Sequence, residues 1–193
     1  MPRNKSERER APLGPIFIFV FVVFFSVSFA LGLLSLSVAA NYDGVAIIWL
    51  PAGAALVALA FIDMRLWPSV ALASMVSNLY FGSTIPTAAG IGIGSTLGAI
   101  LAAYALRFLG PWEELSILYK ALKLGTIGAV ISAAISATIG VSSLYSTGIV
   151  PLSAFAKSWA RWVLGDSVGI FLFSSFVLIY CMIWGYDNSY AEP

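Results

Sequence analysis

The sequence predicts an all-α integral membrane protein, a polytopic bundle of about six transmembrane helices. Of its 193 residues, 60% are hydrophobic and only 10% are charged, which leaves too little polar side chain to cover a soluble globule. The hydrophobic residues also gather in long runs of the length that a transmembrane helix needs. Histidine is absent and there is one cysteine, so an internal disulfide, a phospho-accepting histidine and the usual zinc and haem ligand sets are excluded. We therefore predict no metal and no cofactor.

The apolar runs divide the chain into a polar tail (1–12), a transmembrane domain (13–184) and a short second tail (185–193). A signal peptide is the competing interpretation of the N-terminus, but its apolar region is typically roughly 7 to 15 residues long, much shorter than the first run. The second and third runs each have a tryptophan at their entry and a proline close behind, as expected where a helix starts at the membrane interface. The six predicted spans are 13–40, 45–62, 66–82, 87–109, 124–145 and 155–184.

Small residues recur every fourth position in the fourth and fifth spans. This spacing places them along one face of a helix, where another backbone can approach closely. We predict a tight antiparallel hairpin of these two helices, packed through Gly90, Gly94 and Gly98 on one and Gly128, Ser132, Ser136 and Gly140 on the other.

The segment 111–123 between these spans carries leucines at helical spacing, together with Trp112 and Tyr119, which suit the headgroup level. We interpret it as an amphipathic helix on the membrane surface. A plain solubilising linker is the alternative.

The basic residues predict the orientation. With six spans and a cytoplasmic N-terminus, eight of the ten Lys and Arg residues fall on the inner side, and Lys157 and Arg161 remain outside. The positive-inside rule therefore favours cytoplasmic placement of both termini.

Two ionisable residues, Arg161 and Asp166, lie at the start of the last apolar run. Such a residue at bilayer depth costs from roughly 3 kcal/mol on insertion scales to more than 10 in simulations, so it usually faces the bundle interior and has partners. The alternative is that each is only a satisfied contact between helices or a snorkelling interfacial charge.

Under the predicted topology, polar and aromatic residues gather in the outer half of the membrane. We predict an outward-opening ligand pocket there, although interfacial tryptophans and hydroxyls bonded to their own helix would explain each residue singly. The candidate ligand-binding residues are Trp49, Pro51, Asn78, Ser95, Thr96, Trp159, Arg161, Trp162 and Asp166.

Three pieces of the sequence resemble a known family. Trp49-Leu50-Pro51-Ala52-Gly53, then Leu66-Trp67-Pro68, and finally Trp162-Val163-Leu164-Gly165-Asp166 occur in the order seen in the first membrane-associated sensor (MASE) family of bacterial signalling proteins. The resemblance covers roughly residues 14–184. One departure is Ser95-Thr96-Leu97-Gly98, where the family tends to have an Asn-Thr-Leu-Glu-like run.

The resemblance implies a multi-pass sensory input domain in the plasma (inner) membrane of a prokaryote, without catalytic activity of its own. In the family such a domain serves a histidine kinase or an enzyme of cyclic-di-GMP turnover, and because this chain stops at Pro193 we interpret it as a truncated or stand-alone sensor. The expected partners are the lipid bilayer and a cytoplasmic signalling protein; a homo-oligomer is left open, and no nucleic acid is expected. The alternative function is a solute-binding membrane subunit of a transporter, or a purely structural membrane partner.

Overall fold

The computed structural model describes residues 14–39, 48–108, 119 and 122–183, and every regular element in these ranges is a helix. The predicted all-α class is therefore confirmed for this part of the chain. The predicted surface helix at 111–123 and both tails lie almost wholly outside it. In order, the elements are α2 (Pro15–Ala39), α3 (Leu50–Val57), η1 (Ala58–Ile62), η2 (Met64–Leu66), α4 (Trp67–Tyr80), α5 (Ile85–Phe108), η3 (Leu124–Gly128), α7 (Ala129–Ser146) and α8 (Leu152–Ile183).

Three helical segments are long and apolar enough to cross a membrane: Pro15–Val38, Ile85–Phe108 and Leu124–Ser146. The second and third predicted spans are shorter than expected. α3 has eight residues and its π-helical continuation η1 has five, while α4 has 14; at 1.5 Å per residue each rises about 20 Å, less than the hydrocarbon core of about 30 Å. Six full spans therefore remain a prediction.

Local chemistry explains where the short helices begin and end. Proline occupies the first turn of both α3 and α4, where its missing N–H is not needed. Asp63 starts η2 by accepting the Arg65 backbone N–H at 2.8 Å, and it forms an ion pair with the Arg65 side chain at 2.8 Å. The hydrogen bond from the Arg65 side chain lowers the pKa of the Asp63 carboxyl. Arg107 of α5 donates to the carbonyls of Leu59 and Ala60 at 3.0 and 3.1 Å, which satisfies acceptors near the end of η1.

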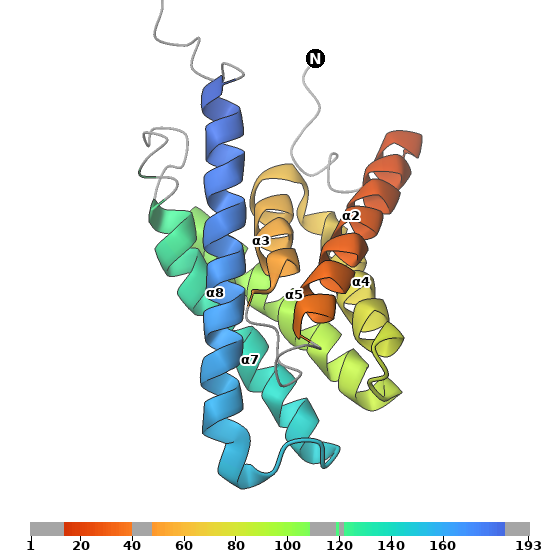
Figure 1. The fold of residues 1–193 in the computed structure, drawn as a ribbon. Coiled ribbons are helices and arrows are strands. Elements are labelled where there is room, and N and C mark those ends of the chain that lie inside the picture. The colour runs from red at the N-terminus through yellow and green to blue at the C-terminus, as the bar shows by residue number, and fades with distance from the viewer. Residues whose placement is uncertain (1–13, 40–47, 109–118, 120–121, 184–193) are drawn as a thin grey trace, which may run out of the picture.

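The helices form one connected bundle (Figure 1). α5 packs against α4 on one side and α7 on the other, α2 packs on α4, and α8 packs on both α7 and α3. The Pro15 end of α2 and the Ile183 end of α8 lie at the same end of the molecule. The interior is filled by Leu56, Leu59, Leu66, Leu106 and Ile170, all fully buried.

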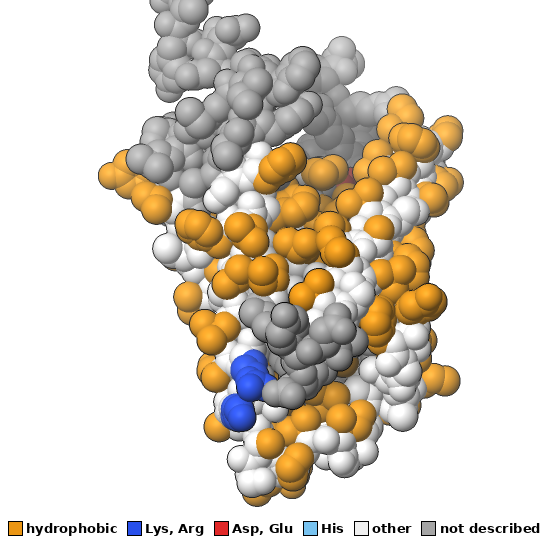
Figure 2. Space-filling view, viewed as in Figure 1, with side chains coloured by type: hydrophobic (Ala, Val, Ile, Leu, Met, Phe, Trp, Pro, Cys, Tyr) orange, Lys and Arg blue, Asp and Glu red, His pale blue; other side chains and the backbone are white. Residues whose placement is uncertain are grey.

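The outer surface is largely apolar. Large hydrophobic side chains such as Phe19, Tyr104, Phe108 and Phe176 are more than half exposed, and hydrophobic side chains cover most of the face seen in Figure 2. A contiguous apolar surface of this extent is typical of a protein that contacts lipid.

The structure places the glycines of α5 against α7. A Cβ on Gly94 would lie 3.1 Å from the Ser136 carbonyl oxygen, and one on Gly98 would lie 2.5 Å from that of Ser132. Gly90 lies opposite Ser143, so residue numbers rise along one helix as they fall along the other and the pair is antiparallel.

Two of the predicted packing residues of the fifth span contact other partners. Gly140 lies under the Trp162 ring of α8, where a Cβ would come within 2.7 Å of ring atoms. Gly128 lies in η3 and faces the side chains of Leu56 and Leu106.

Candidate functional site

The backbones of α3 and α8 meet beside the first resemblance motif. The Trp49 N–H donates to the Gly165 carbonyl oxygen at 3.0 Å. A Cβ on Gly169 would overlap the Trp49 carbonyl oxygen and lie 2.6 Å from its carbonyl carbon, and one on Gly53 would lie 2.6 Å from the Gly169 carbonyl oxygen. Because only glycine permits this approach, the Trp49–Gly53 and Gly165–Gly169 segments form one joint.

Asp166 is next to this joint, near the middle of α8, and is only 2% exposed. Its polar neighbours are the Ser136 side chain of α7 and the Trp162 indole one turn earlier in α8. Both neighbours are uncharged. Among the described residues the recorded ion pair is Asp63–Arg65, so Asp166 has no basic partner there.

The tryptophans of α8 face α7. Trp162 Nε1 donates to Ser136 Oγ at 3.2 Å, and Trp159 Nε1 donates to Thr138 Oγ1 at 3.0 Å. Arg161 is exposed, as is Lys157 nearer the start of α8, and Figure 2 shows a small basic patch toward the end of the molecule where α8 begins. The structure therefore brings Trp162 to Asp166 but leaves Arg161 on the surface.

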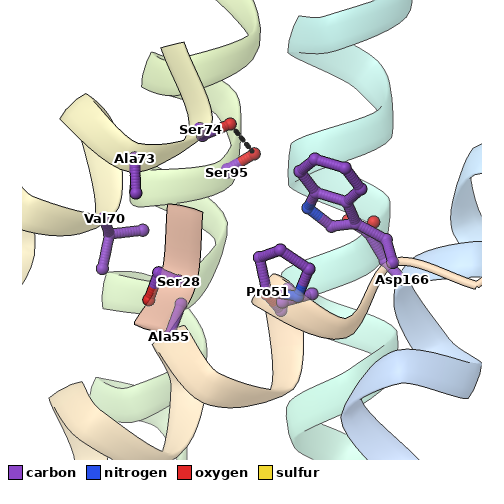
Figure 3. A pocket seen from close by; sticks show the side chains of 11 residues that line it. Ser28, Pro51, Ala55, Val70, Ala73, Ser74, Ser95 and Asp166 are labelled. Carbon is purple, nitrogen blue, oxygen red and sulfur yellow. Dashed lines mark hydrogen bonds between the residues drawn. The ribbon is translucent and has the colours of Figure 1, made fainter. Parts of the chain in front are cut away.

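A small cavity lies beside Asp166 (Figure 3). Its volume is about 20 Å³, which is room for one or two water molecules. Four of the predicted site residues line it: Trp49, Pro51, Ser95 and Asp166. The other lining residues are Ser28, Ala52, Ala55, Val70, Ala73, Ser74 and Ser132.

Serine hydroxyl groups contribute to the lining of the cavity. Ser74 Oγ and Ser95 Oγ are 3.3 Å apart in a hydrogen bond. The Ser28 hydroxyl is fully buried and lacks a hydrogen-bond partner among the described residues. A buried polar group of this kind is normally satisfied, so the cavity offers unfilled hydrogen-bonding capacity.

The other five predicted residues lie outside the cavity lining: Asn78, Thr96, Trp159, Arg161 and Trp162. Asn78 is buried and its Nδ2 donates to the Ser74 carbonyl oxygen at 2.8 Å, while Thr96 is buried and donates to the Gly92 carbonyl oxygen at 2.7 Å. Both of these side chains therefore bond their own helix.

Ser28, Ser74 and Ser132 belong to the cavity although the sequence did not indicate them as ligand residues. Ser132 was predicted only as a packing residue. Ser28 lies in the most apolar helix, α2. The signal that the sequence offers is a hydroxyl group within an apolar run, because such a group must find a polar neighbour.

The arrangement holds a carboxyl group and several hydroxyls in a space of water size. Among the residues that the structure describes, no group of three His, Cys, Asp or Glu side chains suits a transition metal. The hydroxyl groups of this site can therefore form hydrogen bonds to a bound molecule, and its one carboxylate can neutralise a single positive charge.

These features define a helical membrane protein of the polytopic class, with lipid-facing apolar helices around a buried polar centre. The chain belongs to the MASE1 family, whose model matches residues 18–186. The chain is accordingly a membrane-associated sensory domain. No curated protein and no solved structure gives a significant match.

Proposed function

We propose that the chain is a membrane-embedded sensory input module whose stimulus site is the cavity at Asp166. In this proposal a small ligand enters the cavity from the outer side, and the resulting change passes to a cytoplasmic kinase or cyclic-di-GMP output partner. The observation that carries the proposal is that the cavity lining draws on α2, α4, α5, α7 and α8 and on the start of α3. A ligand bound there would contact every major helix.

The joint between α3 and α8 supports transmission of a signal. Because the two backbones are in direct contact through Trp49, Gly165 and Gly169, a shift of one helix must displace the other. α8 continues without a break for 17 residues from Asp166 to Ile183, about 26 Å at 1.5 Å per residue. A rotation or translation at Asp166 would therefore be carried to the far end of α8.

The distribution of charge supports the proposed orientation. Arg65 and Arg107 lie at the end of the molecule where α2 begins, and Lys157 and Arg161 lie at the other. The positive-inside rule then favours a cytoplasmic position for the Ile183 end of α8, which is the end that an output partner would contact.

The test compares folding with signalling in the native host. The gene is deleted and complemented with wild type, Asp166→Asn or the matched control Arg161→Gln, which changes an exposed charge one and a half turns earlier in α8. Because the polar neighbours of Asp166 are uncharged, replacing it with the neutral and nearly isosteric Asn leaves no buried charge unpaired, and we expect Asp166→Asn to fold. Fluorescence size-exclusion profiles measure folding; cellular cyclic-di-GMP and phosphoprotein profiles measure output.

We expect the deletion to change one output, Arg161→Gln to restore it, and Asp166→Asn to leave it unrestored despite normal folding. A folded Asp166→Asn variant that restores the output fully would refute the proposed role of the cavity. No change on deletion would refute the signalling role as a whole.

A further inference from the structure

Among the residues that the structure describes, the buried carboxyl group of Asp166 has no positively charged partner. An ionised carboxylate away from water is very costly unless it is paired, and the polar neighbours of Asp166, the side chains of Ser136 and Trp162, are neutral. The backbone at the nearby start of α3 has no free N–H group to offer Asp166. The Trp49 N–H donates to the Gly165 carbonyl oxygen, and the Leu50 N–H donates to Ser35 Oγ at 3.3 Å. Pro51 has no N–H. The Asp166 carboxyl group is therefore either neutralised by a proton or, when ionised, paired with a positive charge that the described residues do not supply.

The adjoining cavity has the size and the lining of a site for a hard cation. Its volume of about 20 Å³ accepts one or two water-sized species. Its polar lining consists of oxygen groups, the Asp166 carboxylate and the hydroxyls of Ser28, Ser74, Ser95 and Ser132. Oxygen ligands of this kind favour hard cations over soft transition metals.

The unpartnered Ser28 hydroxyl is a second, independent indication. It is 97% buried, since the side chain is only 3% exposed, and it has no hydrogen-bond partner among the described residues. It lies on α2, across Pro51 from Asp166 in Figure 3. A cation beside Asp166 and one water reaching Ser28 would use both the volume and the unfilled acceptor.

We propose that this cavity binds one monovalent cation of the size of Na⁺, held by the Asp166 carboxylate and the Ser132 hydroxyl, with a water bridging to Ser28. A single carboxylate determines the charge, because a divalent ion would leave one positive charge uncompensated at depth. Ser132 lies one turn from Ser136, a polar neighbour of Asp166, so both serines lie on the same face of α7. The inference names a ligand class for the cavity of the proposed function and rests on that role of the cavity.

Binding is measured on the purified full chain in detergent, independently of signalling. Unfolding temperature is followed at fixed pH and ionic strength while NaCl replaces KCl or N-methyl-D-glucamine chloride, and equilibrium binding of ²²Na⁺ gives the stoichiometry. We expect saturable binding of one Na⁺ per chain and a rise in unfolding temperature of roughly 5 to 11 °C at about a hundred times Kd. K⁺ should produce a smaller rise.

Three variants and one control localise the site. Asp166→Asn should abolish ²²Na⁺ binding, Ser132→Ala should raise Kd at least about tenfold, and Ser28→Ala should raise it by a smaller factor. Ser26→Ala is the matched control, because Ser26 is on the same helix but bonds its own backbone at an exposed position. It should bind Na⁺ as wild type does. If Asp166→Asn does not fold, the Na⁺ affinity of Ser132→Ala is the test of the site.

Equal unfolding temperatures in all three salts, with no bound ²²Na⁺, would overturn the inference. An unfolding temperature that depends on pH but not on the cation would overturn it too, because a proton would then neutralise the Asp166 carboxyl group. Unchanged Na⁺ binding in Ser132→Ala would overturn it as well. Because occupancy and output are measured separately, loss of output in Asp166→Asn without any Na⁺ binding would refute the cation and leave the sensory site standing.

Discussion

Substituting Gly169 with alanine tests the joint that supports the cavity. The new Cβ would overlap the Trp49 carbonyl oxygen, lie 2.6 Å from the carbonyl carbon and lie 3.1 Å from the Leu50 nitrogen. All three atoms belong to the backbone, so no side-chain rotation relieves the overlap. The α3 backbone must move away from α8 by about 1.5 Å to restore ordinary contact distances of roughly 3.5 Å.

The expected loss of stability follows from three contributions. Overpacking at a tight contact typically costs about 1 to 3 kcal/mol. A separation of about 1.5 Å also weakens the Trp49–Gly165 hydrogen bond, now 3.0 Å, which contributes about 0.5 to 1.5 kcal/mol. Alanine in a helix regains about 1 kcal/mol over glycine. The net expectation is a destabilisation of about 1 to 3 kcal/mol, or roughly 2 to 12 °C in unfolding temperature for a chain of this length.

The assay is thermal unfolding of the purified chain in detergent, with Gly125→Ala as the matched control. A Cβ on Gly125 would lie 2.9 Å from a ring atom of Phe171, and that side chain is more than half exposed, so the ring can move aside. We expect Gly125→Ala to remain within about 0.5 kcal/mol of wild type. If Gly169→Ala proves as stable as Gly125→Ala, the backbone joint does not exist as described.

Three further predictions concern packing, topology and pH. Gly94→Leu should destabilise the α5–α7 pair by about 1 to 3 kcal/mol while Ile100→Leu is mild; equal unfolding temperatures would contradict this. In a cysteine-free background, a cysteine at Ser83 should label from outside and one at Met64 only after the membrane is permeabilised, and the reverse pattern would invert the topology. The lowered pKa of Asp63 means that its ion pair contributes stability above the unfolded pKa, near 3.8, and loses it as pH falls through the folded value. The difference in unfolding temperature between wild type and Asp63→Asn should therefore shrink in acid, and a difference that grows would refute the pairing.

The helical class and most helix positions could be predicted because they depend on local composition. Apolar runs with tryptophan and proline at their entries locate α3 and α4 to within about five residues. The small-residue period likewise predicts the face of α5 that contacts α7, since only the spacing along one helix is needed. The lengths of α3 and α4 were overestimated, because an apolar residue outside a helix looks the same in sequence as one inside it.

The site was predictable in part. An ionisable residue in an apolar run is conspicuous, and Asp166 lies at the cavity as expected. Arg161 gave the same signal only five residues earlier but lies on the surface, because which side of a helix faces the bundle depends on the packing of its neighbours. Ser28 was missed for the converse reason: it is one of four serines in a long apolar helix, and the sequence does not distinguish the serine that lines a cavity from those bonded to their own backbone.

The length of α3 gives a separate argument for a polar centre in the bundle. Its first turn meets α8 at Gly165, which lies 13 residues after Leu152 and 18 before Ile183, so α3 begins near the middle of α8 rather than at its end. A helix that starts inside a bilayer exposes N–H groups that lipid cannot satisfy, and such starts are tolerated only within protein or beside a polar cavity. Here the Trp49 N–H donates to the Gly165 carbonyl oxygen and the Leu50 N–H donates to the Ser35 hydroxyl. Pro51 has no N–H and so needs no acceptor. Because α3 begins at this level, Trp49 and Pro51 line the cavity together with Asp166. The late start that makes α3 short therefore also forms one side of the cavity.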